Sequence, residues 1–483
     1  MISPSAEPFN ETKYKALSDG LDIEEVLYSN LENSLTIGAE YYGKKYVAAA
    51  NAVKALNHMS LGGISRVITD GDHGSSEYYD SGVLYLLSES VQKGYIDFSK
   101  CRFISQEKNK ELRRSELHPG DVVVTKTGVY YGKSAVIPSS VSKANMIAHV
   151  GKITLHKGYN PYYVSTFLNC KYGYYQLRRR GIKATRPEIK LVEFPDIIVP
   201  IFSDSLDSAI EEVVEKALTL RSAAGECMKL CERLLEAEIG TTGVIASKSN
   251  IVTRSLSESF FNTGRLDAEY YQQKYEKYNK LIRSYKNGYS YIKAEFDQVT
   301  EKCDRMELEY PYVEIGDIDV SSGAASFNHV STDLLPANAK IMTQKGDVLV
   351  STVRPNRGAV AILDTDKLLV SGAFTVLRQK GTLKKEVLQV VLRTRLYRDW
   401  LLRYNVGTSY PVIKDEDVLN MPIPIIEPRN QNVIVAKVQE SIYLRQKSNR
   451  LFEVASRAVE MAIEKNEDCA MTWLNGVASE REA

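Results

Sequence analysis

Hydrophobic and polar positions along residues 39–203 form short stretches, some with the period of a helix and some with that of a strand. Helical spacing covers residues 41–56, and it returns at 162–180 after Pro161, which stands where a helix start is expected. Runs that read as strands lie at 64–68, 83–87, 122–125, 135–137 and 197–201. The turn Pro119-Gly120-Asp121 precedes the third run, so the third and fourth predict a hairpin. We therefore expect mixed helix and strand content with a small sheet.

A much longer helical pattern follows, and another lies near the C-terminus. Over residues 205–238 the apolar positions keep a heptad spacing, which predicts a helix about 50 Å long at ~1.5 Å per residue. These positions are Ile210, Val213, Ala217, Leu220, Ala224, Cys227, Cys231 and Leu234. A less regular stripe consists of Ile434, Val438, Ile442, Leu444, Leu451, Ala455 and Ala458. Each helix could pack on its own domain, or the two could pair and space the domains apart. Their length favours pairing.

The same segments occur twice in the same order. AEYYGKKY at 39–46 corresponds to AEYYQQKY at 268–275. The matched pairs are 39–46 with 268–275 and 91–98 with 320–327 at an offset of 229 residues, 120–137 with 346–363 at 226, and 190–202 with 414–426 at 224, where Leu220-Arg221 also falls on Leu444-Arg445. The copies differ most over 60–115 and 290–345. This ordered agreement indicates a duplicated domain, since the period is far longer than that of a solenoid repeat.

The repeat predicts an α+β (mixed α/β) protein with two tandem domains and two long, paired, antiparallel helices. The expected segments are an N-terminal extension (1–38), a first domain (39–203), a central spacer helix (204–240), a linker (241–267), a second domain (268–428), a C-terminal spacer helix (429–465) and a tail (466–483).

Composition adds few constraints. The chain has 483 residues, 43% of them hydrophobic and 25% charged, with a net charge of +1, so a nucleic-acid binder would need locally clustered basic residues. The six cysteines form no CxxC pair, which is typical of a reducing cytoplasm rather than a disulfide framework or a zinc ribbon. We see no signal peptide and no apolar run of ~20 residues, and we expect a cytoplasmic protein without a membrane contact.

The duplicated order of motifs resembles the specificity subunit of type I restriction–modification systems. The motifs are AEYY near each domain start, DGDHGSSEYYDSGVLYL (70–86), GYIDFSKCRFIS (94–105), the 120–138 stretch, FLNCKYG (167–173), and a proline-bounded strand before each long helix. The second copy lacks a counterpart of Asp70-Gly71 and His73. The resemblance implies two target recognition domains that each read half of a split DNA site. It also implies a helix pair that docks two methyltransferase subunits, joined by restriction translocase–nuclease subunits.

Basic and aromatic residues recur at corresponding places and are our candidates for contacts with double-stranded DNA. In the first copy they are His73, Ser75, Lys126, Tyr130, Tyr131, Lys133, Arg178, Arg179, Arg180, Lys183 and Arg186. In the second copy they are Arg354, Asn356, Arg357, Arg403, Tyr404 and Tyr410. A solvated helix face and an ordinary polar turn remain open as alternatives for these segments.

Three motifs that suggest enzymes are not repeated. Asn160-Pro161-Tyr162-Tyr163 resembles the NPPY box of amino-methyltransferases, although a helix cap is the simpler interpretation. Glu188-Ile189-Lys190 resembles the E-x-K of nucleases, but the second copy has Val412 in place of the glutamate. Cys227 and Cys231 read as helix core positions rather than metal ligands, and no P-loop for ATP is present.

We therefore expect a non-catalytic DNA-reading subunit with no catalytic residues, metal or cofactor of its own. S-adenosylmethionine, ATP and Mg would belong to partner subunits. Two alternatives stay open: a stand-alone methyltransferase or nuclease, and a helical scaffold that does not bind DNA.

Overall fold

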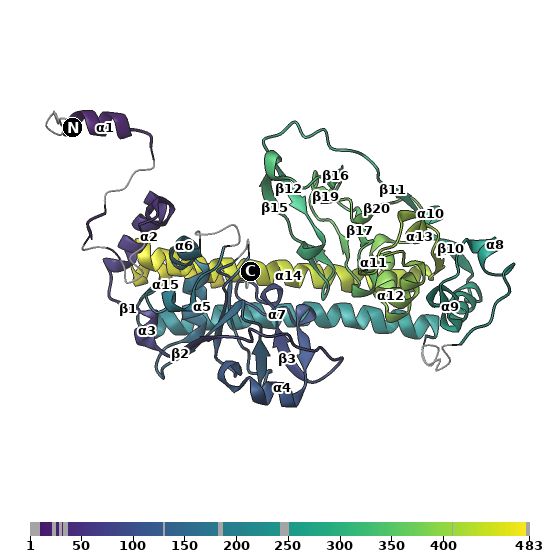
Figure 1. The fold of residues 1–483 in the computed structure, drawn as a ribbon, viewed down its shortest axis with the longest axis horizontal. Helices are drawn as coiled ribbons and strands as arrows, with labels where there is room; N and C mark the ends of the chain where they lie inside the picture. Colours follow the sequence, from purple (N-terminus) through teal and green to yellow (C-terminus); the bar gives the residue numbers. More distant parts are fainter. Residues whose placement is uncertain are drawn as a thin grey trace, which may run out of the picture. The chain divides into compact units, whose positions relative to one another are not determined.

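A computed structural model describes residues 10–21, 26–28, 31, 37–128, 131–181, 187–241, 251–407 and 409–479. The chain divides into two compact units (Figure 1). Unit 1 comprises residues 1–219 and 448–483, and unit 2 comprises residues 220–447. Each unit therefore contains one copy of the repeat, which we call module 1 (39–203) and module 2 (268–428), together with part of both long helices.

Unit 1 begins with α1 (Glu11–Ser18), and module 1 then alternates short helices and strands. Its helices are η2 (Ala39–Tyr42), α2 (Lys44–Lys54), α3 (Leu61–Ile64), η3 (Ser88–Ser90), η4 (Phe98–Lys100), α4 (Gln106–Glu111), η5 (Arg113–Ser115), α5 (Pro161–Asn169), α6 (Lys171–Gly181) and η6 (Leu191–Glu193). Its strands are β1 (His58–Ser60), β2 (Ser65–Asp70), β3 (Val83–Leu86), β4 (Arg102–Ile104), β5 (Val122–Thr125), β6 (Ser134–Val136), β7 (Ala144–Met146), β8 (Val150–Leu155) and β9 (Ile198–Pro200).

The sheets of module 1 are small. One has the order β2-β8-β5-β6, another the order β4-β3-β7, and β1 pairs with β9. The predicted hairpin is confirmed, since Val122 pairs with Val136 in an antiparallel register. The predicted helix over 162–180 is divided at Cys170, where the chain becomes extended between α5 and α6.

Module 2 repeats this order. Its helices are η7 (Ala268–Tyr271), α9 (Gln273–Arg283), α10 (Ile292–Glu295), η8 (Ile315–Asp317), η9 (Thr332–Leu334), η10 (Pro355–Arg357), α11 (Lys385–Arg393), α12 (Arg395–Leu401), η11 (Leu402–Tyr404) and α13 (Asp415–Leu419), preceded by α8 (Phe260–Thr263). Its strands are β10 (Tyr289–Tyr291), β11 (Phe296–Gln298), β12 (Glu309–Val313), β13 (Ile318–Asp319), β14 (Ala324–Ala325), β15 (Asn328–Ser331), β16 (Ala339–Met342), β17 (Val348–Ser351), β18 (Val360–Ile362), β19 (Leu369–Ser371), β20 (Phe374–Gln379) and β21 (Pro422–Pro424).

Its sheet β11-β20-β17-β18 corresponds to β2-β8-β5-β6, and β10 pairs with β21 as β1 pairs with β9. The predicted α+β class and its duplication are confirmed. The modules differ where the sequences diverge: between β15 and β17 module 2 has η9 and β16, whereas between β4 and β5 module 1 has α4 and η5.

The long helices α7 (Asp204–Ile239) and α14 (Pro428–Glu464) pack against each other and run antiparallel. In unit 1 the Ser448 hydroxyl donates to the carbonyl of Ala217 at 2.7 Å. In unit 2 the Ser441 hydroxyl donates to the carbonyl of Ala224, also at 2.7 Å. The partner residue in α7 falls in number as that in α14 rises, so the predicted antiparallel pair is confirmed. A further helix, α15 (Glu467–Ser479), follows in the segment predicted as a tail.

The predicted heptad of α7 is confirmed for one of its two sets of positions, since Ile210, Ala217, Ala224 and Cys231 are buried. The other set is displaced by one residue. The structure buries Val214, Met228 and Leu235 in α7, whereas Val213 and Cys227 are only partly buried and Leu234 is 41% exposed. The displacement arises at the centre of α7, where the core position of the heptad is occupied by Arg221 and not by the apolar Leu220. The matching stripe of α14 likewise runs through Ser441, Arg445 and Ser448 instead of Ile442 and Leu444.

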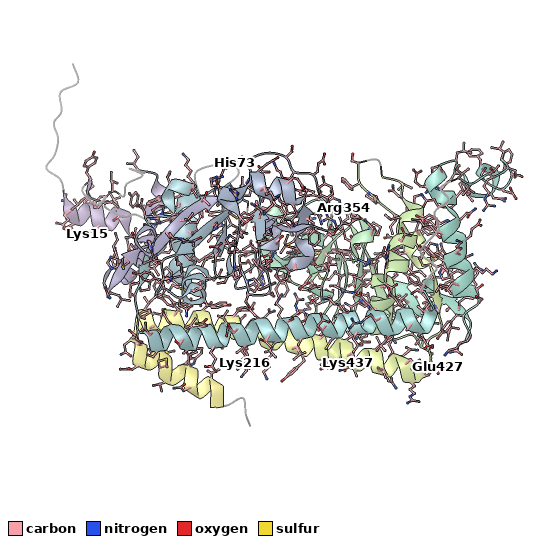
Figure 2. All side chains as sticks on the ribbon, turned by 90° about the horizontal axis from the view of Figure 1, so that it is seen from below. Lys15, His73, Lys216, Arg354, Glu427 and Lys437 are labelled. Atoms are coloured by element: carbon pink, nitrogen blue, oxygen red, sulfur yellow. The ribbon has the colours of Figure 1, made fainter. Side chains whose placement is uncertain are left out.

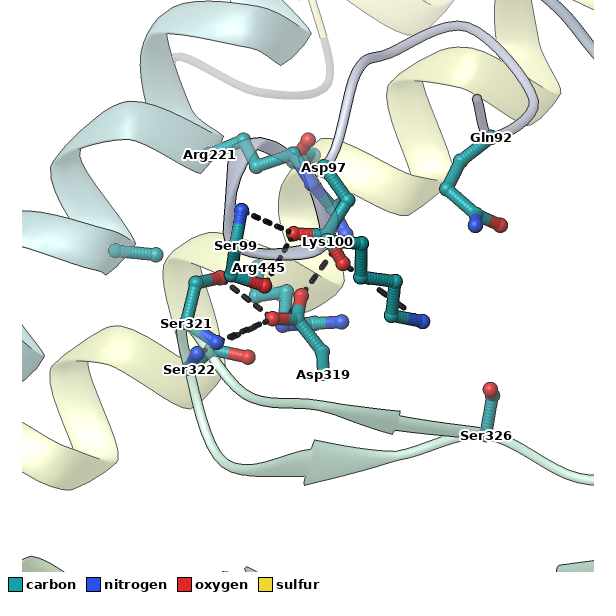
Figure 3. Close-up of polar contacts among 12 residues, drawn as sticks. Gln92, Asp97, Ser99, Lys100, Arg221, Asp319, Ser321, Ser322, Ser326 and Arg445 are labelled. Carbon is teal, nitrogen blue, oxygen red and sulfur yellow. Dashed lines mark hydrogen bonds and ion pairs between the residues drawn. The ribbon is translucent and has the colours of Figure 1, made fainter. Parts of the chain in front are cut away.

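Asp319, at the end of β13, holds these two arginines in unit 2 (Figure 3). Its carboxylate lies 3.5 Å from Arg221 Nη2 and forms an ion pair with Arg445, while it also accepts a bond of 2.8 Å from the backbone N–H of Ser321. Burial alone would raise the pKa of Asp319, but the two guanidinium groups and the Ser321 hydrogen bonds lower it to about 2. The cluster thus fastens module 2 to both long helices by paired charges.

We predict that Asp319→Ala lowers the unfolding free energy of unit 2 by ~3–5 kcal/mol, because two largely buried arginines lose the carboxylate between them. Replacing all three charges, as Arg221→Met, Asp319→Leu and Arg445→Met, should restore most of that loss. Urea unfolding followed by Trp400, which is buried in unit 2, in a Trp473→Phe background measures both variants.

The stabilisation by Asp319 should also depend on pH. Its pKa is depressed in the fold, so the contribution is present above the ordinary value of 3.8 and is lost as the pH falls toward about 2. Asp333→Ala, at an exposed acid of the same module, is the matched control. Equal stability losses in the two alanine variants would contradict the role of the cluster.

Candidate nucleic-acid interface

The strongest candidate surface lies in module 2, on the loop between β17 and β18. Val353 forms a β-bridge with Val412, and the N–H of Arg354 donates to the carbonyl of Pro411 at 2.7 Å. These backbone bonds hold the loop against Pro411 and Val412, which lie far away in the sequence. Arg354 has a left-handed backbone (φ 52°) and starts the turn η10. In Figure 2 Arg354 lies on one side of α14 and Lys437 on the other.

The two basic-aromatic segments predicted in module 2 therefore meet. The guanidinium of Arg354 lies 5.2 Å from the centre of the Tyr410 ring, a cation–π contact. Arg354, Asn356, Arg357 and Tyr410 are all exposed. A guanidinium, an amide and an aromatic ring on one surface can bond base edges, stack or contact phosphates.

Module 1 has the same backbone arrangement. Thr127 forms a bridge with Glu188, and Gly128 N–H donates to the carbonyl of Pro187 at 3.1 Å. Glu188 of the E-x-K motif is thus an element of this bridge. The predicted residues Tyr130, Lys183 and Arg186 lie outside the described residues.

Some predicted DNA contacts point into the protein instead. The guanidinium of Arg179 lies 4.7 Å from the ring of Tyr41, and that of Arg403 lies 4.4 Å from the ring of Tyr270. Arg403 Nε also donates to the carbonyl of Tyr270 at 3.2 Å. Both tyrosines belong to the AEYY motif. Arg179 lies in α6, and Arg403 lies in η11, directly after α12. The recurrence of these residues in both copies thus reflects one repeated packing contact.

Arg180 in module 1 and Tyr404 in module 2 each directly follow one of these two arginines in the sequence. Arg180 is 2% exposed and donates to the carbonyls of Gln176 (2.9 Å) and Asp196 (3.2 Å). Tyr404 is partly buried, with its ring 6.1 Å from that of Tyr270. In this structure Arg179 and Arg180 are buried, so we remove both from the candidate interface.

A second group of predicted residues packs around Tyr131, which is 1% exposed. Its hydroxyl donates to the carbonyl of Arg178 at 2.5 Å, and the Arg178 guanidinium lies 4.1 Å from its ring. A side chain at Gly181 would approach that ring to 2.4 Å. Lys133 is partly buried and donates to Gln92 Oε1 at 2.9 Å. We therefore remove Tyr131 but keep the partly exposed Arg178 and Lys133 as candidates.

The loop after β2 presents His73 and Ser75 from a fixed base. Gly71 is required there, since a Cβ would lie 2.0 Å from the carbonyl oxygen of Met146. Lys126, predicted as a DNA contact, is 3% exposed and pairs with Asp70 at 2.7 Å. Burial raises the pKa of Asp70, but the bonds from Lys126, His73 and Arg114 outweigh it, so the pKa is lowered.

His73 is exposed, with Nε2 3.2 Å from Asp70 Oδ2, and Ser75 is exposed beside it. The structure adds two aromatic residues that our sequence reasoning missed, Tyr78 and Tyr79, each 49% exposed. Their signal was the aromatic pair within the polar stretch 75–80, which is unusual for a core strand.

The methyltransferase-like motif has a structural role. The Asn160 side chain caps α5, accepting from the N–H groups of Tyr162 at 2.9 Å and Tyr163 at 3.3 Å. Cys231 is buried between α7 and α14, and Cys227 is partly buried beside it. Across the described residues no three His, Cys, Asp or Glu side chains gather as metal ligands.

Residues 270–451 match the family of type I restriction modification DNA specificity domains. This match confirms the resemblance seen in the sequence. The match covers module 2 and most of α14, and the repeat relates module 1 to it. No curated protein sequence matches the chain.

Solved structures with similarity include the HsdS subunit from Thermoanaerobacter tengcongensis, at 13% identity over 85% of this chain and 97% of that one, with a TM-score of 0.29. The S subunit of a type I restriction–modification system from M. genitalium matches at 10% identity over 86% and 96%, with a TM-score of 0.35. In the described part of the chain, no helix is both long and apolar enough to span a membrane.

We predict that Arg403→Ala lowers the unfolding free energy by ~1–2 kcal/mol, because it removes the cation–π contact and the hydrogen bond to Tyr270. Arg354→Ala should change it by less than ~0.5 kcal/mol, since Arg354 is exposed. Urea unfolding of both variants checks this difference. A loss with Arg354→Ala as large as that with Arg403→Ala would contradict the division into structural and surface arginines.

Proposed function

We propose that this chain is the DNA-reading specificity subunit of a type I restriction–modification complex, and that each module reads one half of a bipartite site. The observation that carries the proposal is the loop shared by both modules. In module 1 a backbone bridge joins the β5–β6 loop to Glu188, and in module 2 the corresponding bridge joins the β17–β18 loop to Val412. The side chains of the two loops differ. One fold with two sets of loop side chains suits the reading of two different half-sites.

Module 2 offers the better-defined reading surface. Arg357 and Arg354 can each bond guanine bidentately in the major groove, and Asn356 can do so with adenine. In module 1 the described candidates are His73, Ser75, Lys133 and Arg178. Because the net charge of the chain is only +1, its overall electrostatic potential would attract DNA weakly. On this proposal the affinity for DNA comes from such local contacts.

The chemistry would belong to partners. On this proposal the chain is a non-catalytic cytoplasmic subunit that positions two methyltransferase subunits and restriction translocase–nuclease subunits on double-stranded DNA. S-adenosylmethionine, ATP and Mg would be held by those subunits.

The direct test is to map methylated bases in the genome of a host that carries this gene with its neighbouring genes. We expect one asymmetric motif interrupted by a fixed gap, which is lost when this gene alone is deleted. A continuous motif would contradict the two-reader arrangement, and methyl transfer by the isolated chain would contradict the non-catalytic role.

We further predict that Arg354→Ala with Arg357→Ala weakens binding to a duplex carrying the mapped motif by about 10- to 100-fold, because guanidinium contacts to bases are lost. The assembled complex and fluorescence anisotropy are suitable for the measurement. Lys340→Ala, at an exposed lysine of β16, is the control and should have less than about a twofold effect. The half of the motif read by module 2 should relax, and relaxation of the other half would contradict the assignment.

A further inference from the structure

In each module a helix packs against the glycine that follows the turn of the loop. In module 2 this glycine is Gly358, which ends η10 with a left-handed backbone (φ 73°). A Cβ at Gly358 would lie 2.8 Å from Cδ of Arg398 in α12, so only glycine lets the arginine pass this close to the turn. Gly132 and Tyr174 of α6 correspond to these residues in module 1, where a Cβ at Gly132 would lie 3.6 Å from the Tyr174 ring.

The guanidinium of Arg398 is not held by the fold. Its Nε is buried and has no hydrogen-bond partner within the described residues, although the side chain as a whole remains partly exposed. The neighbouring carboxylate, Asp399, instead accepts bonds from Lys274 Nζ at 2.8 Å and from the Tyr278 hydroxyl at 2.9 Å. A buried N–H without an acceptor costs free energy, so polar bonds within the protein do not explain an arginine at this position.

A second arginine adds to the positive charge near Arg398. Arg393 of α11 is buried and pairs with Glu232 of α7 at 3.3 Å. Burial lowers the pKa of Arg393, and the positive charge of Arg398 acts in the same direction. Glu232 balances only one of these two guanidinium groups. The uncompensated charge lies directly beside the loop that carries Arg354 and Arg357, and it would attract an anion.

Module 1 gathers positive charge at the same place with different residues. Lys93 Nζ lies 4.9 Å from the centre of the Tyr174 ring, and the guanidinium of Arg178 lies 5.8 Å from it. The two copies therefore share a positive charge beside the turn, but they do not share the residue that provides it. A packing contact would depend on the shape of the side chain, whereas an anion requires only the charge.

We propose that Arg398 binds a phosphate of the DNA backbone beside the loop of module 2. This role rests on the proposed function and divides its labour among the arginines. Arg354 and Arg357 contact bases and so carry sequence information, whereas Arg398 fixes the position of the duplex whatever its sequence. A guanidinium is well suited to this role, because its N–H groups match the geometry of a phosphate.

The salt dependence of DNA binding by the assembled complex tests the role of Arg398. Arg398→Met keeps an unbranched side chain against Gly358 and removes the charge. It should weaken binding to a duplex with the mapped motif about three- to tenfold, and it should reduce the slope of log K against log salt concentration by about one. A duplex with a scrambled motif should show the same loss, and the methylated motif should stay unchanged. Arg398→Lys keeps the charge and should retain most of the slope.

Arg283→Met is the matched control. It removes the same charge from the same module, at an arginine that already bonds the hydroxyls of Tyr289 at 2.8 Å and Tyr291 at 3.0 Å, and it should leave the slope unchanged. In urea unfolding Arg398→Met should lose no stability, unlike Arg403→Ala.

Three results would overturn the role of Arg398 and leave the proposed function intact. They are an unchanged slope in Arg398→Met, an equal reduction of the slope in Arg283→Met, and a relaxed motif in Arg398→Met, which would make Arg398 a reader of bases. If the unaltered complex does not bind the duplex at all, the proposed function fails as well.

Discussion

The antiparallel contact between α7 and α14 is the constraint on which both units depend. Each long helix follows one module in the sequence, yet each unit takes part of both helices. Unit 1 needs residues 448–483 from the far end of the chain to complete its core, where Val454, Ala458 and Val459 join Ile210 and Val214. Such contacts between distant parts of the chain carry a large loop-closure cost during folding, so local segments cannot complete either unit alone.

The middle of this contact is polar, which is unusual for a helix pair. Arg221 and Arg445 occupy core positions of the buried stripe, and Asp319 from module 2 neutralises part of their charge. Two serine hydroxyls bond backbone carbonyls across the pair, which lets the helices approach closely there. Apolar helices can slide in register at little cost, whereas displaced arginines would lose the carboxylate. We infer that these polar contacts fix the register.

The sequence predicted the class of fold and the helix pair, because apolar periodicity follows from backbone geometry. It predicted the duplication because the same motifs occur twice in the same order. It predicted only one of the two sets of core positions in α7, since Leu220 looks like a better core residue than Arg221 and the carboxylate that pairs with Arg221 comes from Asp319, far away in the sequence. The candidate site shows the same limit. The sequence indicated Arg354, Asn356, Arg357 and Tyr410, which are exposed, but also Arg179, which stacks on Tyr41. Recurrence in both copies marks residues that the fold needs, so it favoured the structural arginines over the variable loop residues.

The β-bridges Thr127–Glu188 and Val353–Val412 have one consequence for how this protein can change over time. They join the loop of each module to its neighbouring segment through main-chain atoms, which every residue except proline can supply. Side chains on the loop can therefore be exchanged without loss of the anchor that holds it. Such a scaffold accumulates new surface chemistry by point substitution, and two modules that began as identical copies can drift apart independently.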